Sequence, residues 1–515
     1  MAATYKAAVA AGHTLVTAAA CELLRVGGNA FDAVVAAGFA SAVVEPALTS
    51  LGGGGFLLAR TAQGKATLFD FFTDTPGRSL SGGALEPHFL PVTVRFPASD
   101  QIFNVGLGSV AVPGNLKGLL YIHRRLGSLP LKEVLAPAVR LAREGVCLST
   151  FQAYVLGLLY PIMTLTAAGR ALYEPERRFL QENDLLVNPE LADFLETLPQ
   201  EGEREFYQGE LARRIARDMQ AGQGLLTAAD LAAYEVIERD PLRADYRGLQ
   251  LLTNPLPSFG GSLIALSLRL LETCEAGSLP FGSAAQLALL AAVMEEVDRC
   301  RAAGVLGPEE LAAAELAERQ ARVRTASGGT TQISVCDATG NAASMTTSNG
   351  EGSGYIVPGA GIMLNNMMGE DDLHPDGFHA SPPGVRVASM MAPSLLLEGG
   401  QVRLVLGSGG SKRIRTAILQ VLGHLIDHGL PLQEAVEAPR LHWDGECLQM
   451  EPGFTDQAIA ALRQRWPVNL WPVRDVYFGG VHAVSPWGES AGDPRRGGSA
   501  VVLENYPCKR SPPSP

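Results

Sequence analysis

The sequence lacks the short motifs by which most hydrolases and nucleotide-binding enzymes are found. It contains no G-x-S-x-G elbow, no H-E-x-x-H pair, no P-loop, and no G-x-G-x-x-G after an expected strand. The GSGGSK segment at 407–412 superficially suggests a phosphate loop, but it does not have the spacing of a P-loop. These absences argue against the commonest serine, zinc and nucleotide chemistries.

Cysteine pairs, basic runs and long apolar runs are missing as well. The seven cysteines are scattered and show neither C-x-x-C nor zinc-ligand spacing, so we expect buried thiols in a reducing compartment. The net charge of −12, without any local Lys/Arg run, gives no electrostatic footprint for nucleic acid. No uncharged run of 18 strongly apolar residues predicts a membrane span. We therefore expect no metal, nucleic-acid or membrane partner.

The chain has 515 residues, of which 47% are hydrophobic and 18% charged. It is long enough for two or three ordinary domains or one large layered domain. Its first 20 residues are apolar but lack a basic start, so we interpret them as a core element with a helical pattern rather than an export signal. This interpretation favours a cytoplasmic protein, or a periplasmic or secreted one if the true start lies upstream.

Hydrophobic periodicity and turn residues divide the chain near 325–330 into a helix-rich and a strand-rich part. The pattern predicts helices at 15–30, 29–44, 115–125, 132–145, 189–198, 209–222, 263–272, 284–325 and 413–428. It predicts strands at 56–60, 66–72, within 241–255, and at 330–337, 341–348, 361–366, 394–400 and 401–410. A Gly/Pro-rich loop is expected after 72, and the Pro/Ser-rich tail 506–515 is expected to be disordered. Strands interleaved with long helices imply helices on both faces of mixed sheets.

The segment 327–349 is the strongest candidate for chemistry. Two glycines lead directly into Thr330 and Thr331 at the start of an expected strand. Glycines before a hydroxyl residue allow a turn sharp enough to bring that hydroxyl onto the preceding carbonyl. The hypothesis is that the Gly329–Thr330 bond breaks itself and leaves Thr330 as a new N-terminus. A plain β-turn entering a strand is the alternative.

An N-terminal threonine needs no histidine, because its own α-amine, with a reference pKa of about 7.7–8, is a suitable base. The glycines at 407–410 end one element and begin another, so their N–H groups are candidates for an oxyanion hole. A tight strand–helix turn explains the same glycines equally well. The acidic loop 369–376 lacks calcium-site spacing and is interpreted as solvated. His442 and His482 are interpreted as structural residues.

Many ordered segments together resemble one family, the γ-glutamyltransferases (glutathione hydrolases) of the N-terminal-nucleophile hydrolase superfamily. The resemblance covers nearly the whole chain. It includes GGNAFDAVVAA (27–37), SLGGGGFLL (50–58), VAVPGNLKG (110–118), TTQISVCDATGNAASMTTSN (330–349), GIMLNNMMGE (361–370) and GSGGSKRIRTAILQVLGHLID (407–427).

This resemblance implies an α/β (α+β) fold, a four-layer αββα sandwich of the N-terminal-nucleophile type. It implies cleavage into a large subunit, 1–329, and a small subunit, 330–515, which remain one intertwined domain as a heterodimer, or as a dimer of these. Thr330 matches the family's nucleophile, and Ser348 matches a supporting threonine. Gly409 and Gly410 match the oxyanion-hole glycines, with Gly410–Ser411 as the alternative register. No cofactor or metal is implied.

Substrate recognition departs from the family pattern. Phe72 stands where the family uses an arginine for the α-carboxylate of the γ-glutamyl group, and a phenylalanine cannot make that bidentate contact. Met367 replaces the first residue that reads the α-amine, and Glu370 is the best match for the second. Two further substrate-binding candidates are Ser389, whose paired serine is here Met390, and Asn349 in a shortened loop.

Three functions remain open at this point. The first is a self-processing enzyme acting on a small amide or peptide such as glutathione or another γ-glutamyl compound. The second uses the same chemistry on another acyl group, as in cephalosporin-acylase-like relatives, with Arg386 or Lys412 supplying the missing cation. The third is an unprocessed, inactive homologue that only binds. The intact Thr330 and the retained glycine loop argue against the third.

Overall fold

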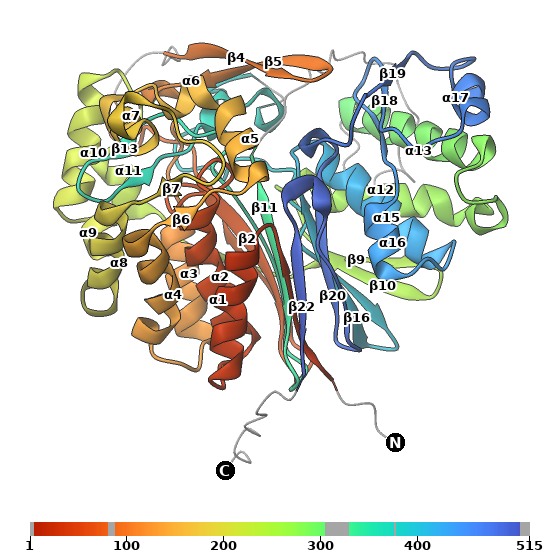
Figure 1. Cartoon of the computed structure of the whole chain (residues 1–515), viewed down its shortest axis with the longest axis horizontal. Coiled ribbons are helices and arrows are strands. Elements are labelled where there is room, and N and C mark those ends of the chain that lie inside the picture. The colour runs from red at the N-terminus through yellow and green to blue at the C-terminus, as the bar shows by residue number, and fades with distance from the viewer. Residues whose placement is uncertain (1–4, 81–87, 304–328, 375–376, 505–515) are drawn as a thin grey trace.

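The computed structural model describes residues 5–80, 88–303, 329–374 and 377–504. Figure 1 shows two β-sheets packed face to face between two layers of helices. The predicted α/β (α+β) four-layer sandwich is therefore confirmed. The expected disordered tail and most of the expected helix after 303 lie outside the described residues.

The first sheet has seven strands, each antiparallel to its neighbours. From one edge to the other they are β22 (Ser499–Leu503), β1 (Ala7–Ala11), β11 (Thr331–Cys336), β12 (Ala342–Ser348), β2 (Gly54–Arg60), β3 (Ala66–Phe71) and β8 (Ile237–Arg239). The predicted strands around 330–348 thus form a hairpin near the middle of this sheet, where both faces are covered.

The second sheet has six antiparallel strands. In order they are β21 (Glu489–Ala491), β20 (Gly480–Ser485), β16 (Gln401–Gly409), β15 (Ser394–Glu398), β10 (Leu249–Thr253) and β9 (Leu242–Tyr246). Strands β11 and β12 of the first sheet lie against β16 of the second, and one buried apolar cluster joins the two inner faces. The start of β11 and the end of β16 therefore meet between the sheets.

Helices cover the outer face of each sheet (Figure 1). On the first sheet's side lie α1 (Thr14–Arg25), α2 (Ala30–Val44), α3 (Asn115–Leu126), α4 (Leu131–Glu144), α8 (Pro189–Glu201), α9 (Arg204–Tyr207), α10 (Glu210–Ala221) and α11 (Ala228–Ala233). On the second sheet's side lie α12 (Phe259–Glu272), α13 (Ala284–Ala302), α15 (Arg413–Ile426), α16 (Leu432–Glu437) and α17 (Asp456–Leu462). Helix α2 is buried along its whole length and begins with the predicted cap, a capping box of Asn29 and Asp32.

Shorter elements complete the molecule. They are α5 (Thr150–Leu158), α6 (Tyr160–Met163), α7 (Ala167–Tyr173), β4 (Leu90–Phe96), β5 (Ser99–Val105), β6 (Val146–Cys147), β7 (Leu185–Leu186), β13 (Ile356–Val357), β14 (Ile362–Met363), β17 (Leu441–Trp443), β18 (Leu448–Met450) and β19 (Val468–Leu470). Among the described helices, none combines the length and the apolar character that a bilayer span needs.

Three local predictions were wrong, and two strands were missed. Residues 7–11 form the buried strand β1 rather than helix, because a strand covered on both faces carries no alternation that would reveal it. The expected loop after 72 contains the hairpin β4–β5. The predicted strand 361–366 is reduced to the two residues of β14. Strands β20 and β22 were not predicted at all.

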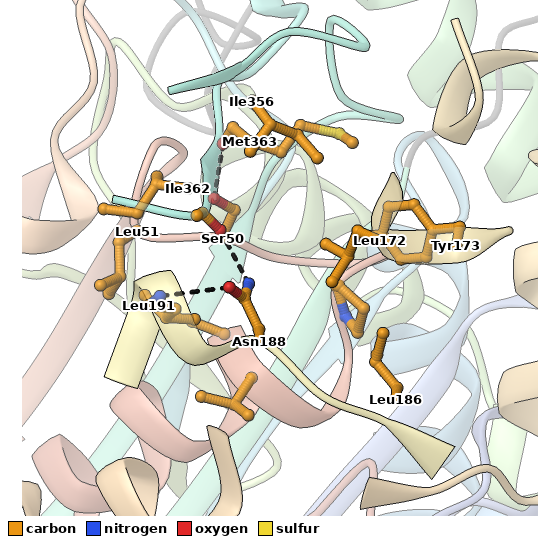
Figure 2. Close-up of a pocket in the computed structure, with 14 residues that line it drawn as sticks. Ser50, Leu51, Leu172, Tyr173, Leu186, Asn188, Leu191, Ile356, Ile362 and Met363 are labelled. Carbon is orange, nitrogen blue, oxygen red and sulfur yellow. Dashed lines mark hydrogen bonds between the residues drawn. The ribbon is translucent and has the colours of Figure 1, made fainter. Parts of the chain in front are cut away.

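Figure 2 shows a small cavity between α2, α7, α8 and the β13–β14 hairpin. Its volume of about 20 Å³ is enough for roughly one water molecule. Two polar side chains at its wall are paired: Ser50 donates to the carbonyl of Met363 at 2.5 Å, and Asn188 accepts from the N–H of Leu191 at 3.1 Å. Since no candidate nucleophile lines it, we interpret this cavity as a packing feature.

Candidate active site

Thr330 immediately precedes β11 and is buried between the two sheets, with 3% of its surface exposed. Its hydroxyl donates to Oγ of Ser348 at 3.5 Å, and the Ser348 hydroxyl donates to the carbonyl oxygen of Gly329. The N–H of Gly350 donates to the same Ser348 oxygen at 2.9 Å. The candidate nucleophile and the carbonyl of the bond it would attack therefore belong to one hydrogen-bonded chain.

The glycines at the end of β16 lie directly against Thr330. A Cβ atom placed on Gly409 would collide with the carbonyl oxygen of Thr330, so this close approach requires glycine. Gly410 has a φ of 121°, a conformation that other residues rarely adopt. The structure thus brings together Thr330, Ser348, Gly409 and Gly410, the four candidate catalytic residues.

Arg496 is a member of the site that the sequence did not reveal. Its Nη1 donates to the carbonyl oxygen of Thr330 at 2.8 Å, and its Nη2 donates to the carbonyl of Val476 at 3.2 Å. Burial lowers the pKa of Arg496 to about 10, although Asp493, Asp475 and Glu45 act against this shift. At neutral pH a buried positive charge therefore stands beside the candidate nucleophile.

Glu45, just after α2, is a second buried charge near Thr330. It accepts from the hydroxyl of Thr331, with oxygen–oxygen distances of 3.1 and 3.2 Å. Burial raises the pKa of Glu45 to about 7, although Thr331 and Arg496 favour the ionised form. The sequence offered one weak signal for this role, an acidic residue that ends an otherwise apolar helix.

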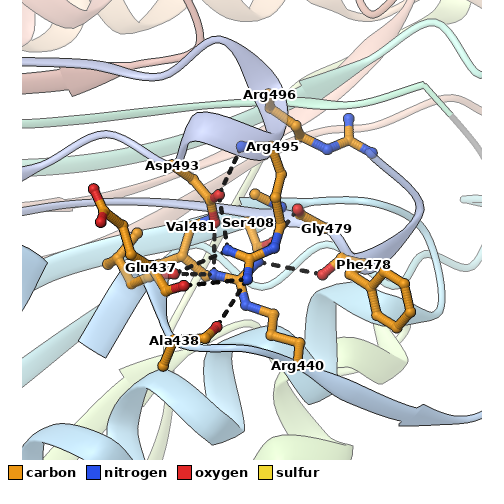
Figure 3. A network of polar contacts seen from close by, with 12 residues as sticks. Ser408, Glu437, Ala438, Arg440, Phe478, Gly479, Val481, Asp493, Arg495 and Arg496 are labelled. Atoms are coloured by element: carbon orange, nitrogen blue, oxygen red, sulfur yellow. Dashed lines mark hydrogen bonds and ion pairs between the residues drawn. The ribbon is translucent and has the colours of Figure 1, made fainter. Parts of the chain in front are cut away.

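A buried ion network fixes the loop that carries Arg496 (Figure 3). Asp493 pairs with Arg440 at 2.5 Å and with Arg495 at 3.2 Å, and it also accepts from the N–H of Val481 at 2.9 Å. Burial alone would raise the pKa of Asp493, but the two arginines lower it to about 2. Figure 3 shows that Arg496 points away from this network, which leaves its guanidinium to Thr330.

Glu351 holds the residue before the predicted cleavage point. The N–H of Gly329 donates to Oε1 of Glu351 at 3.1 Å, and the side chain of Asn366 donates to the other oxygen at 3.3 Å. Glu370 lies close by, because a Cβ atom on Gly350 would collide with its Oε1. Glu370 was a candidate from its sequence position, whereas Glu351, in the shortened loop after Ser348, was not.

The residues that depart from the family pattern are all buried in apolar surroundings. Phe72 stacks on Phe56 with ring centroids 5.4 Å apart, and Met367 and Met390 belong to the same apolar cluster. Arg386 does not fill the vacated role. It pairs with Asp70 at 3.4 Å and Asp74 at 3.2 Å and also donates to the carbonyl of Phe72. Arg386 is therefore already engaged by two buried carboxylates, and its role as a substrate-binding cation stays a prediction.

The other candidate substrate residues differ in whether their side chains have polar atoms without a hydrogen-bond partner. Neither side-chain polar atom of the buried Asn349 has a hydrogen-bond partner within the described ranges, and the same holds for Oε1 of Glu370. Ser389 uses its hydroxyl oxygen to accept the N–H of Met391 at 3.1 Å. Burial lowers the pKa of His482 to about 4, and its Nδ1 accepts from a backbone N–H, as expected of a structural histidine.

The sequence and the fold were compared with known proteins. The family model described as gamma-glutamyltranspeptidase matches residues 16–321 and 307–503. The chain is 34% identical over 480 residues to the acylase ACY 1 proenzyme of Pseudomonas sp. (strain SE83), covering 89% of this chain and 86% of that protein. It is 32% identical over 508 residues to the glutathione hydrolase proenzyme of Escherichia coli (strain K12), covering 89% and 84%.

Among solved structures, the cephalosporin acylase from Bacillus halodurans superposes with a TM-score of 0.82 at 26% identity, over 98% of this chain and 97% of that one. Two antiparallel sheets between helix layers, superposing this closely, define the N-terminal-nucleophile hydrolase class. More narrowly, the chain belongs to the gamma-glutamyltranspeptidase family and is an enzyme of that family. Both conclusions confirm the resemblance found in the sequence.

Proposed function

We propose that the chain cleaves itself between Gly329 and Thr330, and that Thr330 then takes the acyl group from a small amide and passes it to water or an amine. The observation that carries this proposal is the hydrogen-bonded chain from the Thr330 hydroxyl through Ser348 to the Gly329 carbonyl. Acyl transfer needs a nucleophile and hydrogen-bond donors to the carbonyl that it attacks. Thr330 and Ser348 provide these groups, and the two adjoining glycines can add backbone donors.

In the first reaction, Oγ of Thr330 attacks the carbonyl carbon of Gly329. The bond from that carbon to the nitrogen of Thr330 breaks, and the nitrogen takes the proton that the hydroxyl loses. An ester of Gly329 on Thr330 results, and water hydrolyses it to a Gly329 carboxylate and a free Thr330 α-amine. Ser348 supports this step, because its hydroxyl donates to the oxygen on which negative charge develops.

In each later turnover, the α-amine of Thr330 accepts the hydroxyl proton while Oγ attacks the substrate carbonyl. The proton passes to the leaving amine, and the acyl group stays on Thr330 as an ester. Water or an acceptor amine then removes it. Backbone N–H groups at Gly409 and Gly410 are the proposed oxyanion donors, since this loop lies against Thr330.

Cleavage would leave a heterodimer of residues 1–329 and 330–515. This is supported by the sheets, because each contains strands from both parts: β11 lies between β1 and β12, and β15 pairs with β10. Separating the parts would expose the buried faces of both sheets. We therefore propose that the two subunits remain together, alone or as a dimer of such pairs.

For the substrate, the proposal is a γ-glutamyl compound such as glutathione, by analogy with the glutathione hydrolase relative. One observation favours a second candidate, a different acyl amide, by analogy with the acylase relatives. Phe72 stands at the position where an arginine is expected and is buried against Phe56, while Arg386 is engaged by two aspartates.

Denaturing gel electrophoresis of purified protein tests self-cleavage. Two bands are expected for the wild type, with Thr330 as the N-terminal residue of the smaller one, and a single full-length band for Thr330→Ala. Thr339→Ala is the matched control, because Thr339 lies in the turn between β11 and β12 and its hydroxyl contacts Asp337 and Asn341 of the same turn. The proposal would be contradicted if the wild type gave a single uncleaved band and the same preparation hydrolysed no amide substrate.

A further inference from the structure

A second cavity lies against Gly329, apart from the one in Figure 2. Its volume is about 30 Å³, enough for roughly two water molecules. Its wall includes Gly329 and Arg496. Most of the wall is apolar and comes from the loop after α2, from the hairpin β4–β5 and from α5, with Leu48, Phe96, Phe103, Val155 and Leu159. An apolar space thus adjoins the bond that Thr330 is proposed to attack.

If Thr330 acts as proposed above, on which this inference rests, Gly329 marks the place of the substrate's acyl group. During self-cleavage, Gly329 is itself the acyl group that Thr330 attacks. In a substrate that takes its place, the carbonyl carbon replaces that of Gly329, and the next two chain atoms replace its α-carbon and its nitrogen. The nitrogen of Gly329 donates to Glu351 at 3.1 Å, and Glu351 also lines the cavity. A straight acyl chain therefore runs from Thr330 past Glu351 into the cavity.

The α-carbon of Gly329 has no room for a side chain. A Cβ atom placed on it would collide with the carbonyl oxygens of Gly350 and Ala47 and would lie 3.3 Å from the α-carbon of Leu48. All of these are backbone atoms, which cannot move aside as the end of a flexible side chain can, and overpacking against them is unfavourable. An acyl group with a substituent on the carbon next to its carbonyl meets the same atoms. The site therefore favours an unbranched chain.

The apolar wall is separate from the positions at which the family pattern has substrate contacts. Phe72, Met367 and Met390 belong to the cluster between the two sheets. The side chains of the cavity belong to a different buried cluster, which contains Leu48, Phe103, Val155 and Leu159. Transfer of methylene groups from water into such surroundings is favourable and grows with the apolar area that is buried. The cavity therefore suits a saturated hydrocarbon chain.

The polar groups beside the cavity are largely engaged. Nη1 and Nη2 of Arg496 donate to the carbonyls of Thr330 and Val476. Glu351 accepts from Asn366, and burial raises the pKa of Glu351, which favours the neutral acid beside an apolar chain. Nε of Arg496 has no hydrogen-bond partner in the described part of the chain. An acyl chain that ends in a carboxylate is therefore the competing ligand.

We propose that this cavity binds an unbranched, apolar acyl chain of the substrate, with a length limit of about five carbons. The carbonyl carbon and the two atoms that replace the α-carbon and nitrogen of Gly329 account for three of these positions. The cavity itself has room for roughly two more. Phe103 and Val155, which line the cavity, then determine the chain length that the enzyme accepts.

Para-nitroanilides with different acyl groups test the length and polarity of the chain on processed enzyme. We expect kcat/KM to rise about threefold to fourfold with each methylene from acetyl to pentanoyl and to fall again at octanoyl. A methyl group next to the carbonyl, in the 2-methylpentanoyl compound, should lower kcat/KM by about tenfold or more. The glutaryl and γ-glutamyl compounds have the same chain length and add a carboxylate, so they should react more slowly than the pentanoyl compound. Faster turnover of either one, or no dependence on chain length, overturns the inference.

Two variants of opposite effect assign the selectivity to the wall. Phe103→Ala enlarges the cavity and should raise the ratio of octanoyl to pentanoyl turnover by about tenfold or more. Val155→Ile adds one methylene to the wall and should move the preferred chain toward butanoyl. Val94→Ala is the control, because Val94 is buried on the neighbouring strand β4 and is not among the residues that line the cavity. If Phe103→Ala does not fold, Val155→Ile carries the same test. A chain-length preference that neither variant moves, or that Val94→Ala moves equally, contradicts the assignment.

Binding separates failure of this inference from failure of the proposed function. Calorimetry on processed wild-type enzyme should detect pentanoate and should show weaker binding of acetate and glutarate. Absence of this order overturns the inference even where the anilides are cleaved. Binding in the expected order without turnover of any anilide supports the apolar acyl site and contradicts the proposed amidase function.

Discussion

Replacing Arg496 by methionine should move the pH dependence of catalysis. The α-amine of the processed Thr330 acts as base only when it is neutral, and a nearby positive charge disfavours its protonated form. Arg496 lies 2.8 Å from the carbonyl oxygen of Thr330, and the nitrogen and oxygen of one residue are roughly 3 Å apart. The two charges are therefore separated by roughly 6 Å, once the delocalised guanidinium charge is taken into account.

At this separation and an effective dielectric constant of about 20, the repulsion is about 3 kcal/mol, or about two pH units. Nearby acidic groups reduce the effect of this repulsion on the pKa of the amine. Glu45 acts on Arg496 directly, and Glu351 lies beside Gly329 with Glu370 and Asp372 further along. Arg413 and Lys412 act in the same direction as Arg496. We therefore expect Arg496→Met to raise the amine pKa by about one to two units.

The assay is the pH profile of kcat/KM, whose acid limb reports the pKa of the base in the free enzyme. The limb should move to higher pH, so that activity near neutrality falls by about tenfold or more and recovers at alkaline pH. Arg403→Met is the control, because Arg403 is exposed and pairs with Glu398 on the surface. A uniform loss of activity at every pH would refute the electrostatic argument and leave Arg496 with a purely positional role.

Three further outcomes follow from the same contacts. Ser348→Ala should slow self-cleavage by about 10²–10³-fold, followed as band conversion over time, because the Gly329 carbonyl loses its donor. Asp493→Asn should lower the free energy of unfolding by about 3–5 kcal/mol, since it removes the carboxylate that pairs with the buried Arg440, while Arg495 keeps Glu451. In the wild type, the lowered pKa of about 2 means that this stabilisation is complete above about pH 4 and is lost as pH falls toward 2, which acid titration of unfolding checks. Phe72→Arg alone should lower the melting temperature without raising the turnover of γ-glutamyl substrates. The triple variant that also carries Met367→Gln and Met390→Ser should raise that turnover.

Much of the fold followed from features that are local in sequence. Asn29 and Asp32 predicted the start of α2. The alternating pattern after Thr330 predicted the two strands that pair as β11 and β12. The predicted contact between the Thr330 hydroxyl and the preceding carbonyl is indirect in the structure, because the Ser348 hydroxyl lies between them. Strand β1 was missed because a strand buried on both faces has no polar side to mark it.

The rest of the site depends on contacts that no local pattern encodes. Arg496 reaches Thr330 from 166 positions away. Its neighbour Arg495 has the same chemistry but faces the opposite way, into the network with Asp493 (Figure 3). Only the tertiary structure distinguishes the two. Glu45 is similar, because its proximity to Thr331 arises when the end of α2 packs over the central strands.

The departures from the family pattern form one coupled change rather than three independent losses. Phe72, Met367 and Met390 come from distant parts of the chain, yet all lie in the apolar cluster that joins the two sheets. A charged residue at any one position would be buried without a partner, which costs several kcal/mol, whereas apolar residues at all three pack together. The buried Glu370 is different, because its Oε1 has no hydrogen-bond partner among the described residues. At these three positions, buried apolar side chains thus stand where the family pattern has polar ones.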